Sequence, residues 1–492
     1  MPPATQSTCS HRTITYNPSP HATQVQFEQP TPKQRRVSQN PNPGSNLTLN
    51  PTQSRTDLDT FPAPLVLPGD DLALDPEYPP QDFQEWHDEG ERNPVTARRR
   101  TIYVVSPPEV DPGIAYVGEW ATSKPQENDR DLTDSIAVPR TQDVIDYLSA
   151  FYHGLPVKKL EIPNWMFAPW TEQEELPPSK RKGKGERIQK KPKDQYIALS
   201  TASECIRIRT RPSPDGIYTH QLNLDDLLDV AISVLPKDAY ALCMLVNHDL
   251  FEDEDDAFVC GRAYGGSRVA VVSTARYNPL LDPVQDVERA HAWPAAHCLS
   301  YIQAICKDEG PLPKRKKASQ LSTRSHTSVA NNKPLEAALA AYSEPPPRSR
   351  SPDTENASTL WLWRIARTVS HELGHCFGLD HCVYYACIMQ GSASLSEDAR
   401  QPPYLCPVDL AKVLFATGST VDARDRALLR YCERPGVRDG AGFRAYAAWL
   451  RASLGLGGVD SGEEGHNAVT DGRGGSGLIT ESWRKLWEDF ED

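Results

Sequence analysis

Three histidines and one glutamate lie close together in the segment HELGHCFGLDHC, residues 371–382. His371 and His375 are four positions apart, so on a helix their imidazoles project from one face and can reach the same metal ion. Glu372 would then lie at the flank of that face, where its carboxylate can accept a proton from a water on the metal without binding the metal itself. The spacing therefore predicts a metal site that performs hydrolysis. The alternative is a structural histidine pair, which is the more common role of two histidines on a helix.

A glycine and a third histidine follow at the spacing that would complete the site. We expect Gly378 to end the helix in a left-handed conformation, and the resulting reversal of the chain can bring His381 to the open side of the ion. Three neutral nitrogen donors leave a fourth tetrahedral position for water, which is the arrangement of catalytic zinc. We predict that His371, His375 and His381 bind a catalytic zinc ion and that Glu372 is the general base.

The complete pattern HExxHxxGxxH, followed by Met389 in CIMQG, resembles the signature of the metzincin metallopeptidases and their Met-turn. Within that clan, HELGHCFGLDHCVYYACIM resembles the archaemetzincins, which have cysteines at the places of Cys382 and Cys387. The resemblance covers most of residues 99–434. It implies an α+β or α/β fold, a metzincin-like mixed twisted sheet backed by the active-site helix. The antiparallel edge strand of such a sheet lines the cleft; residues 258–263 are the best candidate for it, and an extended peptide could pair with it.

The same resemblance implies a second, structural zinc site of four cysteines. Three thiols match its places: Cys382, Cys387 and Cys406. Asp409 stands where the fourth cysteine is expected. A carboxylate oxygen can bind zinc at about 2.0–2.2 Å, so a site of three cysteines and one aspartate is chemically reasonable. Its affinity should be lower than that of four thiolates, because zinc is a borderline-soft ion. Cys376 and Cys432 are spare thiols that could substitute, and the alternative is a group of unligated core thiols.

Several segments have the periodicity of elements that could hold these residues. Residues 359–378 have the length and apolar spacing of a buried helix, and residues 141–155 and 222–236 have the spacing of amphipathic helices. Runs rich in β-branched and apolar residues predict strands: 98–106, 196–210, 239–247, 257–266 and 267–277. The run at 239–247 is apolar throughout, which favours a strand covered on both faces.

The composition changes along the chain, and we divide it accordingly. Residues rich in Pro, Ser, Thr, Asn and Gln predict a disordered N-terminal tail, although the apolar patch FPAPLVLPGDDLAL could dock on the folded part. Two polar, basic and proline-rich stretches predict disordered insertions. The predicted parts are as follows: tail 1–96, metallopeptidase domain 97–440 with insertions 172–194 and 308–357, and C-terminal tail 441–492 with an amphipathic helix at 482–491.

The overall composition limits the cellular setting and the partners. The 492 residues are 38% hydrophobic, include 44 prolines and carry a formal net charge of -13, which speaks against a nucleic-acid-binding surface. We find no apolar run of about 20 residues and no apolar stretch typical of a secretory signal. We therefore expect an intracellular protein, cytoplasmic or nuclear and not secreted, that binds neither nucleic acid nor membrane and is monomeric. In that setting, the eleven cysteines are expected to be thiols or metal ligands.

Three functions are compatible with these patterns. The first, which we favour because every residue of the catalytic site is present, is a zinc metallopeptidase that hydrolyses peptide or protein substrates. The second is a peptide-binding module that has kept the fold and lost turnover. The third is a zinc-stabilised scaffold whose tails recognise other molecules.

Overall fold

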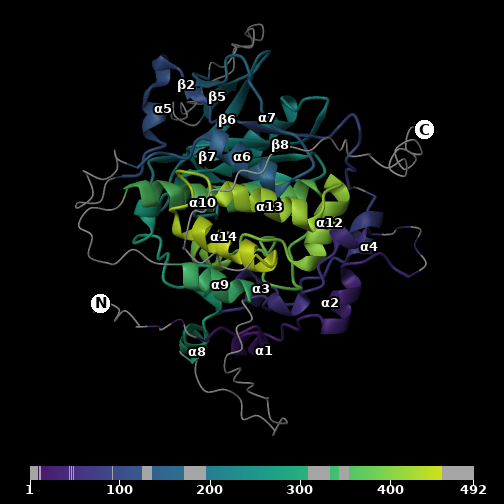
Figure 1. The fold of residues 1–492 in the computed structure, drawn as a ribbon. Helices are drawn as coiled ribbons and strands as arrows, with labels where there is room; N and C mark the ends of the chain where they lie inside the picture. The colour runs from purple at the N-terminus through teal and green to yellow at the C-terminus, as the bar shows by residue number, and fades with distance from the viewer. Residues whose placement is uncertain are drawn as a thin grey trace, which may run out of the picture.

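The computed structural model describes residues 9, 11, 13–43, 45, 47, 49–90, 92–124, 136–170, 196–307, 333–342 and 354–456. A central five-stranded sheet and a second, six-stranded sheet occupy the upper half of the view in Figure 1, and helices pack beneath the central sheet. In the part of the chain that the structure describes, no helix is long and apolar enough to cross a membrane.

The central sheet has the strand order β10-β11-β8-β1-β3. Its strands are β1 Thr101–Val105, β3 Val157–Lys159, β8 Ala239–Val246, β10 Gly261–Tyr264 and β11 Val269–Ser273. The pairs β3–β1, β1–β8 and β8–β11 are parallel, whereas β10 is antiparallel to β11 and forms one edge. The predicted mixed architecture is confirmed, and the edge strand β10 overlaps the second half of the strand predicted at 258–263.

Both faces of this sheet are covered, which explains the continuous apolar run of β8. Ala241, Cys243 and Leu245 pack into the core on the side of α10. The intervening Leu242 and Met244 pack on the opposite side against α7, Leu224–Ser233. Side chains alternate between the two faces of a strand, so a strand buried on both faces has apolar residues at every position.

The second sheet has the order β2-β4-β5-β6-β7-β9 and is mostly antiparallel. Its strands are β2 Glu109–Val110, β4 Met166–Ala168, β5 Tyr196–Ser200, β6 Cys205–Pro212, β7 His220–Asn223 and β9 Asp249–Phe251. Helix α7 contacts both sheets, and the short α5, Tyr116–Glu119, lies beside the second one. Asn223 caps α7 by accepting a hydrogen bond from the backbone N–H of Asp226.

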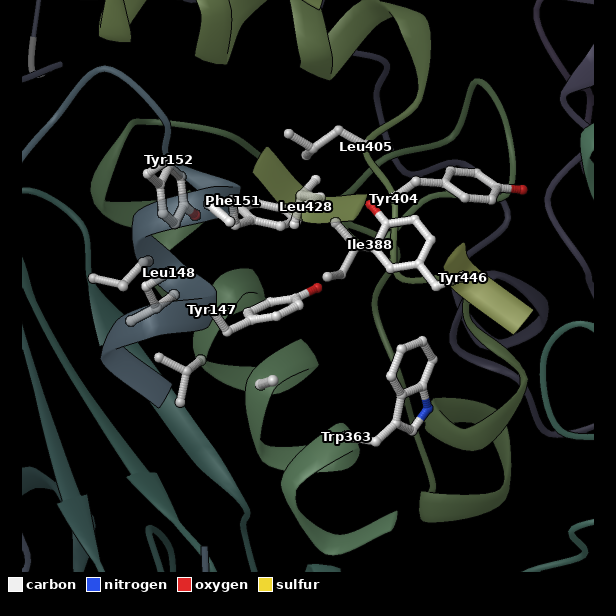
Figure 2. Packing of buried hydrophobic residues seen from close by; sticks show 14 of the residues in the cluster. Tyr147, Leu148, Phe151, Tyr152, Trp363, Ile388, Tyr404, Leu405, Leu428 and Tyr446 are labelled. Atoms are coloured by element: carbon white, nitrogen blue, oxygen red, sulfur yellow. The ribbon is translucent and has the colours of Figure 1, made fainter. Parts of the chain in front are cut away.

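Helix α10, Thr354–Cys376, packs on the central sheet beside α6, Thr141–Phe151. The remaining helices of this layer are α11 Leu395–Arg400, α12 Pro407–Thr417, α13 Val421–Cys432 and α14 Ala441–Ser453. Figure 2 shows Trp363 of α10, Tyr147 of α6 and Tyr446 of α14 converging on one apolar core with Ile388. Helix α10, on which His371 and His375 lie, is therefore packed into this core.

The prediction of a disordered tail over residues 1–96 is wrong for the described part of that segment. It forms α1 Pro20–Gln24, α2 Pro32–Ser38, α3 Asp71–Leu74 and α4 Phe83–Asp88, which lie along the lower and right-hand sides of Figure 1. Phe83 and Trp86 are fully buried, and the Trp86 Nε1–H donates a hydrogen bond to the Phe377 carbonyl at 2.8 Å. The prolines begin helices instead of preventing them, because Pro20 and Pro32 occupy first-turn positions, where no amide hydrogen bond is lost.

Two further boundaries need correction. The predicted C-terminal tail begins with α14, in which Tyr446, Trp449 and Leu450 are buried. Within the predicted insertion 308–357, the Ala/Leu-rich α9, Pro334–Ala341, packs on α14 through the buried Leu335, because its apolar side chains are more stable against that helix than in water. The predicted insertion 172–194 and the predicted helix 482–491 lie outside the described residues. One more helix, α8 Leu299–Lys307, packs near α1.

Candidate metal centre and substrate cleft

The three predicted histidines converge at the end of α10. The Nε2 atoms of His371 and His375 are 3.1 Å apart, and the ring of His381 lies 5.4 Å and 5.1 Å from the rings of His371 and His375 between centroids. One ring nitrogen from each of the three lies within 4.8 Å of the others. Three imidazole donors at this separation suit a single zinc ion, whose Zn–N distances are about 2.0–2.1 Å.

Backbone carbonyls set the tautomer of the first two histidines. His371 Nδ1–H donates to the Ile388 carbonyl and His375 Nδ1–H to the Leu379 carbonyl, each at 2.7 Å. Because a carbonyl only accepts, Nδ1 carries the proton and the Nε2 lone pair is left for a metal. Burial lowers the pKa of His375 to about 4 and holds the pKa of His371 well below its usual value, so both rings are neutral donors at pH 7.

The chain reversal that brings up His381 depends on Gly378. As predicted, this glycine has a left-handed conformation, with φ at +76°. The Leu379 N–H donates to the Gly374 carbonyl at 3.2 Å, which closes the helix end as in a Schellman motif. A β-carbon at position 378 would also lie 3.0 Å from the side chain of Arg92. The backbone conformation and the space both favour glycine here.

Met389 lies against α10 beside the histidines. A β-carbon at Gly374 would be 2.5 Å from the Met389 sulfur, so the thioether packs directly on the helix backbone one residue before His375. Met389 is fully buried, and its carbonyl accepts the N–H of Cys382 at 2.8 Å. These contacts give Met389 a packing position next to the ligands, as expected from its place in the sequence.

Glu372 lies on the wall of a cleft of about 910 Å³. Burial raises the pKa of the Glu372 carboxyl to about 8, with an opposing effect from Arg262. Three parts of the chain border the cleft: α10 through His371 and Glu372, the edge strand through Gly261 and Arg262, and the N-terminal segment, which is the described part of residues 1–96, through Glu89 and Arg92. The carboxylate therefore lies beside the histidines and borders the same space.

The edge strand is held against α10 by a close backbone contact. A β-carbon at Gly265, in the turn after β10, would be 2.5 Å from the His375 carbonyl oxygen. Residues Phe258 to Ala263 all border the cleft, and β10 pairs with β11 on one side only. An extended peptide in the cleft could therefore pair with β10 next to Glu372 and the histidines.

The predicted second group is also brought together. Cys382, Cys387, Cys406 and Asp409 are all buried, with their ligand atoms within 4.8 Å of one another. The Cys382 and Cys406 sulfurs are 3.5 Å apart, and Asp409 Oδ2 lies 3.3 Å from the Cys387 sulfur and 3.5 Å from the Cys406 sulfur. Tetrahedral zinc with Zn–S bonds of about 2.3 Å has ligands roughly 3.8 Å apart, close to these values. Cys376 and Cys432 are buried elsewhere in the core and do not belong to this group.

Lys412 is a member of this site that sequence reasoning missed. Its Nζ lies 3.1 Å from Asp409 Oδ1 and donates to the Gln81 carbonyl at 2.7 Å. Burial raises the pKa of Asp409 to about 7; the neighbouring Cys382 raises it further, and Lys412 lowers it. The three-residue spacing from Asp409 to Lys412 on a helix was the available signal, since side chains at i and i+3 are neighbours.

The N-terminal segment supplies further contacts that sequence reasoning missed. Gln81 Nε2–H donates to the Gly378 carbonyl at 3.0 Å, and the Asp380 N–H donates to Gln81 Oε1 at 3.3 Å. The ring of Tyr78 lies 5.8 Å from the ring of His381. Residues of the N-terminal segment thus contact the turn that carries His381. They follow directly after the apolar patch FPAPLVLPGDDLAL, which we expected could dock on the folded part.

Comparisons with known proteins show which proteins this chain is similar to. The model of peptidase family M54 matches residues 349–413, a range that contains both predicted metal sites. Archaemetzincin-2 of Macaca fascicularis is 25% identical to this chain over an alignment that covers 76% of this chain and 74% of that protein. Archaemetzincin-2 of Homo sapiens is 24% identical over an alignment that covers 83% of this chain and 87% of that protein. The crystal structure of archaemetzincin from Methanopyrus kandleri shares 16% identity and a TM-score of 0.28, covering 65% of this chain and 97% of that one.

The sequence matches and the converged histidines define the class of the protein, which is a zinc metallopeptidase. Within that class, the sequence matches support the archaemetzincin family.

Proposed function

We propose that this protein hydrolyses peptide bonds with one zinc ion held by His371, His375 and His381 and with Glu372 as the general base. The observation that carries the proposal is the convergence of the three ring nitrogens within 4.8 Å, in a cleft that the half-buried Glu372 also borders. Zinc bound there would polarise the scissile carbonyl and activate a water for attack.

Each residue of the chain then has a defined task. The Glu372 carboxylate takes the proton of the attacking water and delivers it to the leaving amine. The Nδ1–H bonds of His371 and His375 to backbone carbonyls keep their Nε2 lone pairs directed at the metal position. Strand β10 orients an extended substrate by main-chain hydrogen bonds. Peptide substrates follow from the family, whereas a monomeric state and a lack of nucleic-acid binding stay predictions.

The second group supports the first one mechanically. We expect Cys382, Cys387, Cys406 and Asp409 to bind a structural zinc ion with no open position. Cys382 directly follows His381, and Cys387 lies two residues before Met389. A metal bound by these residues would therefore fix the chain directly beside His381 and close to Met389.

Glu372→Gln tests the catalytic assignment. The variant should keep its zinc, because the glutamate is not a ligand, and should lose roughly 10²–10⁴-fold in peptide turnover, the usual contribution of a positioned base. Cleavage of a peptide library and the zinc content of the purified protein are the two measurements. Glu109→Gln, an exposed residue on the second sheet, is the matched control and should leave both unchanged.

The outcomes separate the remaining functions. Equal turnover in the parent and in Glu372→Gln would show that the assignment is wrong. A parent protein that binds peptides in the cleft but cleaves none would instead be the peptide-binding module, since the edge strand can bind a peptide without catalysis. A parent that does neither, and whose zinc is lost on His375→Ala, would be a zinc-stabilised scaffold.

A further inference from the structure

A third group of metal-ligand residues lies outside both sites described above. Ligand atoms of Cys9, His11 and His291 are within 4.8 Å of one another. A fourth donor adjoins them, because the Cys298 sulfur lies 3.0 Å from the Cys9 sulfur, and both cysteines are free thiols. Two cysteines and two histidines are a common donor set of structural zinc sites.

A short ladder of backbone hydrogen bonds brings these residues together from opposite ends of the sequence. Ile14 pairs in antiparallel fashion with Cys298, the Thr15 N–H donates to the His297 carbonyl at 2.9 Å, and the Leu299 N–H donates to the Thr13 carbonyl at 2.9 Å. Cys9 and His11 precede this ladder by a few residues and so lie beside Cys298. His11 has φ at +48°, a left-handed conformation that is uncommon for a residue with a side chain.

His291 has the arrangement of a metal-binding histidine. Its Nδ1 is hydrogen-bonded to Glu288 Oε1 at 2.9 Å, and its ring stacks on Tyr301 with centroids 3.8 Å apart, so its orientation and tautomer are both set. The side chain is only 4% exposed, and no described residue meets its Nε2 with hydrogen-bond geometry, although the Cys9 thiol lies beside it. A metal bond would satisfy this buried nitrogen. A carboxylate behind the histidine is the usual outer partner of a zinc ligand.

We propose that Cys9, His11, His291 and Cys298 bind an additional zinc ion. The mixture of sulfur and nitrogen donors suits zinc, whereas calcium and magnesium require oxygen. Zinc bonds of about 2.0–2.3 Å place tetrahedral ligands roughly 3.3–3.8 Å apart, so the donors would have to draw closer around the ion on binding. Four protein ligands leave no open position, and the site is therefore structural.

The position of this site gives it a role in the fold. The four proposed ligands come from two regions that are far apart in the sequence: the start of the N-terminal segment and the region just before α8, Leu299–Lys307. The same N-terminal segment later contributes Gln81 and Arg92 to the turn and the cleft at the catalytic histidines. Zinc at the Cys9 site would hold one end of the segment that borders the active site.

The zinc content of the full-length chain, purified under reducing conditions, tests the proposal. Cys9→Ser and His291→Gln should each contain one zinc ion fewer per chain than the parent. Cys205→Ser, which changes an exposed thiol, and His87→Gln, which changes a histidine outside the group, should contain as many as the parent. Equal zinc in the parent and both site variants would overturn the proposal.

Alkylation of the unmodified parent gives a readout that does not depend on a variant folding. Zinc should protect the partly exposed Cys9 from iodoacetamide, and a chelator should remove the protection, whereas the exposed Cys205 should react in both conditions. Equal reaction of Cys9 with and without chelator would contradict the proposal, as would a Cys9–Cys298 disulfide in the reduced, zinc-loaded protein. Neither measurement involves peptide cleavage, so both are independent of the result with Glu372→Gln.

Discussion

Asp409 connects the second metal group to a buried charge, and its replacement by alanine should be strongly destabilising. One oxygen of the carboxylate faces the thiols, and the other lies 3.1 Å from the Lys412 ammonium. Both side chains are at most 2% exposed. Asp409→Ala removes one proposed ligand and leaves Lys412 buried without its carboxylate. Removing one partner of a buried ion pair costs about 3–5 kcal/mol, which is a large part of the roughly 5–15 kcal/mol that stabilises an ordinary domain.

Denaturant unfolding with zinc present, at a pH well above 7 so that the carboxylate is ionised, measures this loss. We expect Asp409→Ala to lose about 3–5 kcal/mol and one zinc ion per chain. In the double variant with Lys412→Met, the loss should be smaller than the sum of the two single losses, because no unpaired charge remains buried. Asp409→Cys should bind zinc more tightly than the parent, since thiolate is the better donor. A cost of Asp409→Ala below about 1 kcal/mol, with unchanged zinc, would refute both the ion-pair and the ligand assignment.

Two further predictions concern the fold around the site. Trp86→Ala should lower the free energy of unfolding in urea by about 3–5 kcal/mol, because the indole is fully buried and bonded to the Phe377 carbonyl; a change near zero would mean that the N-terminal segment is not part of the fold. Burial lowers the pKa of His248 to about 4, against about 6.5 in the unfolded chain. His248 therefore stabilises the fold fully above pH 6.5 and loses about 3 kcal/mol of that contribution as the pH falls through 4. His248→Gln should reduce the loss of stability between pH 7 and pH 4, and an unchanged loss would contradict the shift.

The grouping of His371, Glu372 and His375 could be predicted because its information is local. His371, Glu372 and His375 need only a helix to lie together, and the apolar spacing of α10 predicts that helix. Gly378 ends that helix because glycine readily adopts the left-handed conformation that this helix end requires. The continuous apolar run of β8 likewise predicts a strand covered on both faces, and the glycines after β10 predict a turn. Spacing along the chain was therefore sufficient to predict this helix and its end, whereas the edge position of a strand at 258–263 was implied by the family resemblance.

The N-terminal segment could not be predicted in the same way. Its buried residues, such as Phe83 and Trp86, have no period, because each fills a separate position on a surface made by other elements. Its prolines and polar residues have the composition of disorder, although some of them begin and cap short helices. Only the assembled fold shows which of these residues are covered.

By itself, the sequence determined the helix that carries His371 and His375, because apolar spacing within one segment predicts it. Its resemblance to the archaemetzincins implied the residues of the second group and the mixed sheet. Tertiary structure alone decided that Lys412 adjoins Asp409 and Gln81, that the N-terminal segment borders the cleft, and that Cys9 lies beside Cys298. Contacts of this second kind join residues that are far apart in the chain. They result from the sum of many weak packing and hydrogen-bond energies, which no local pattern of residues encodes.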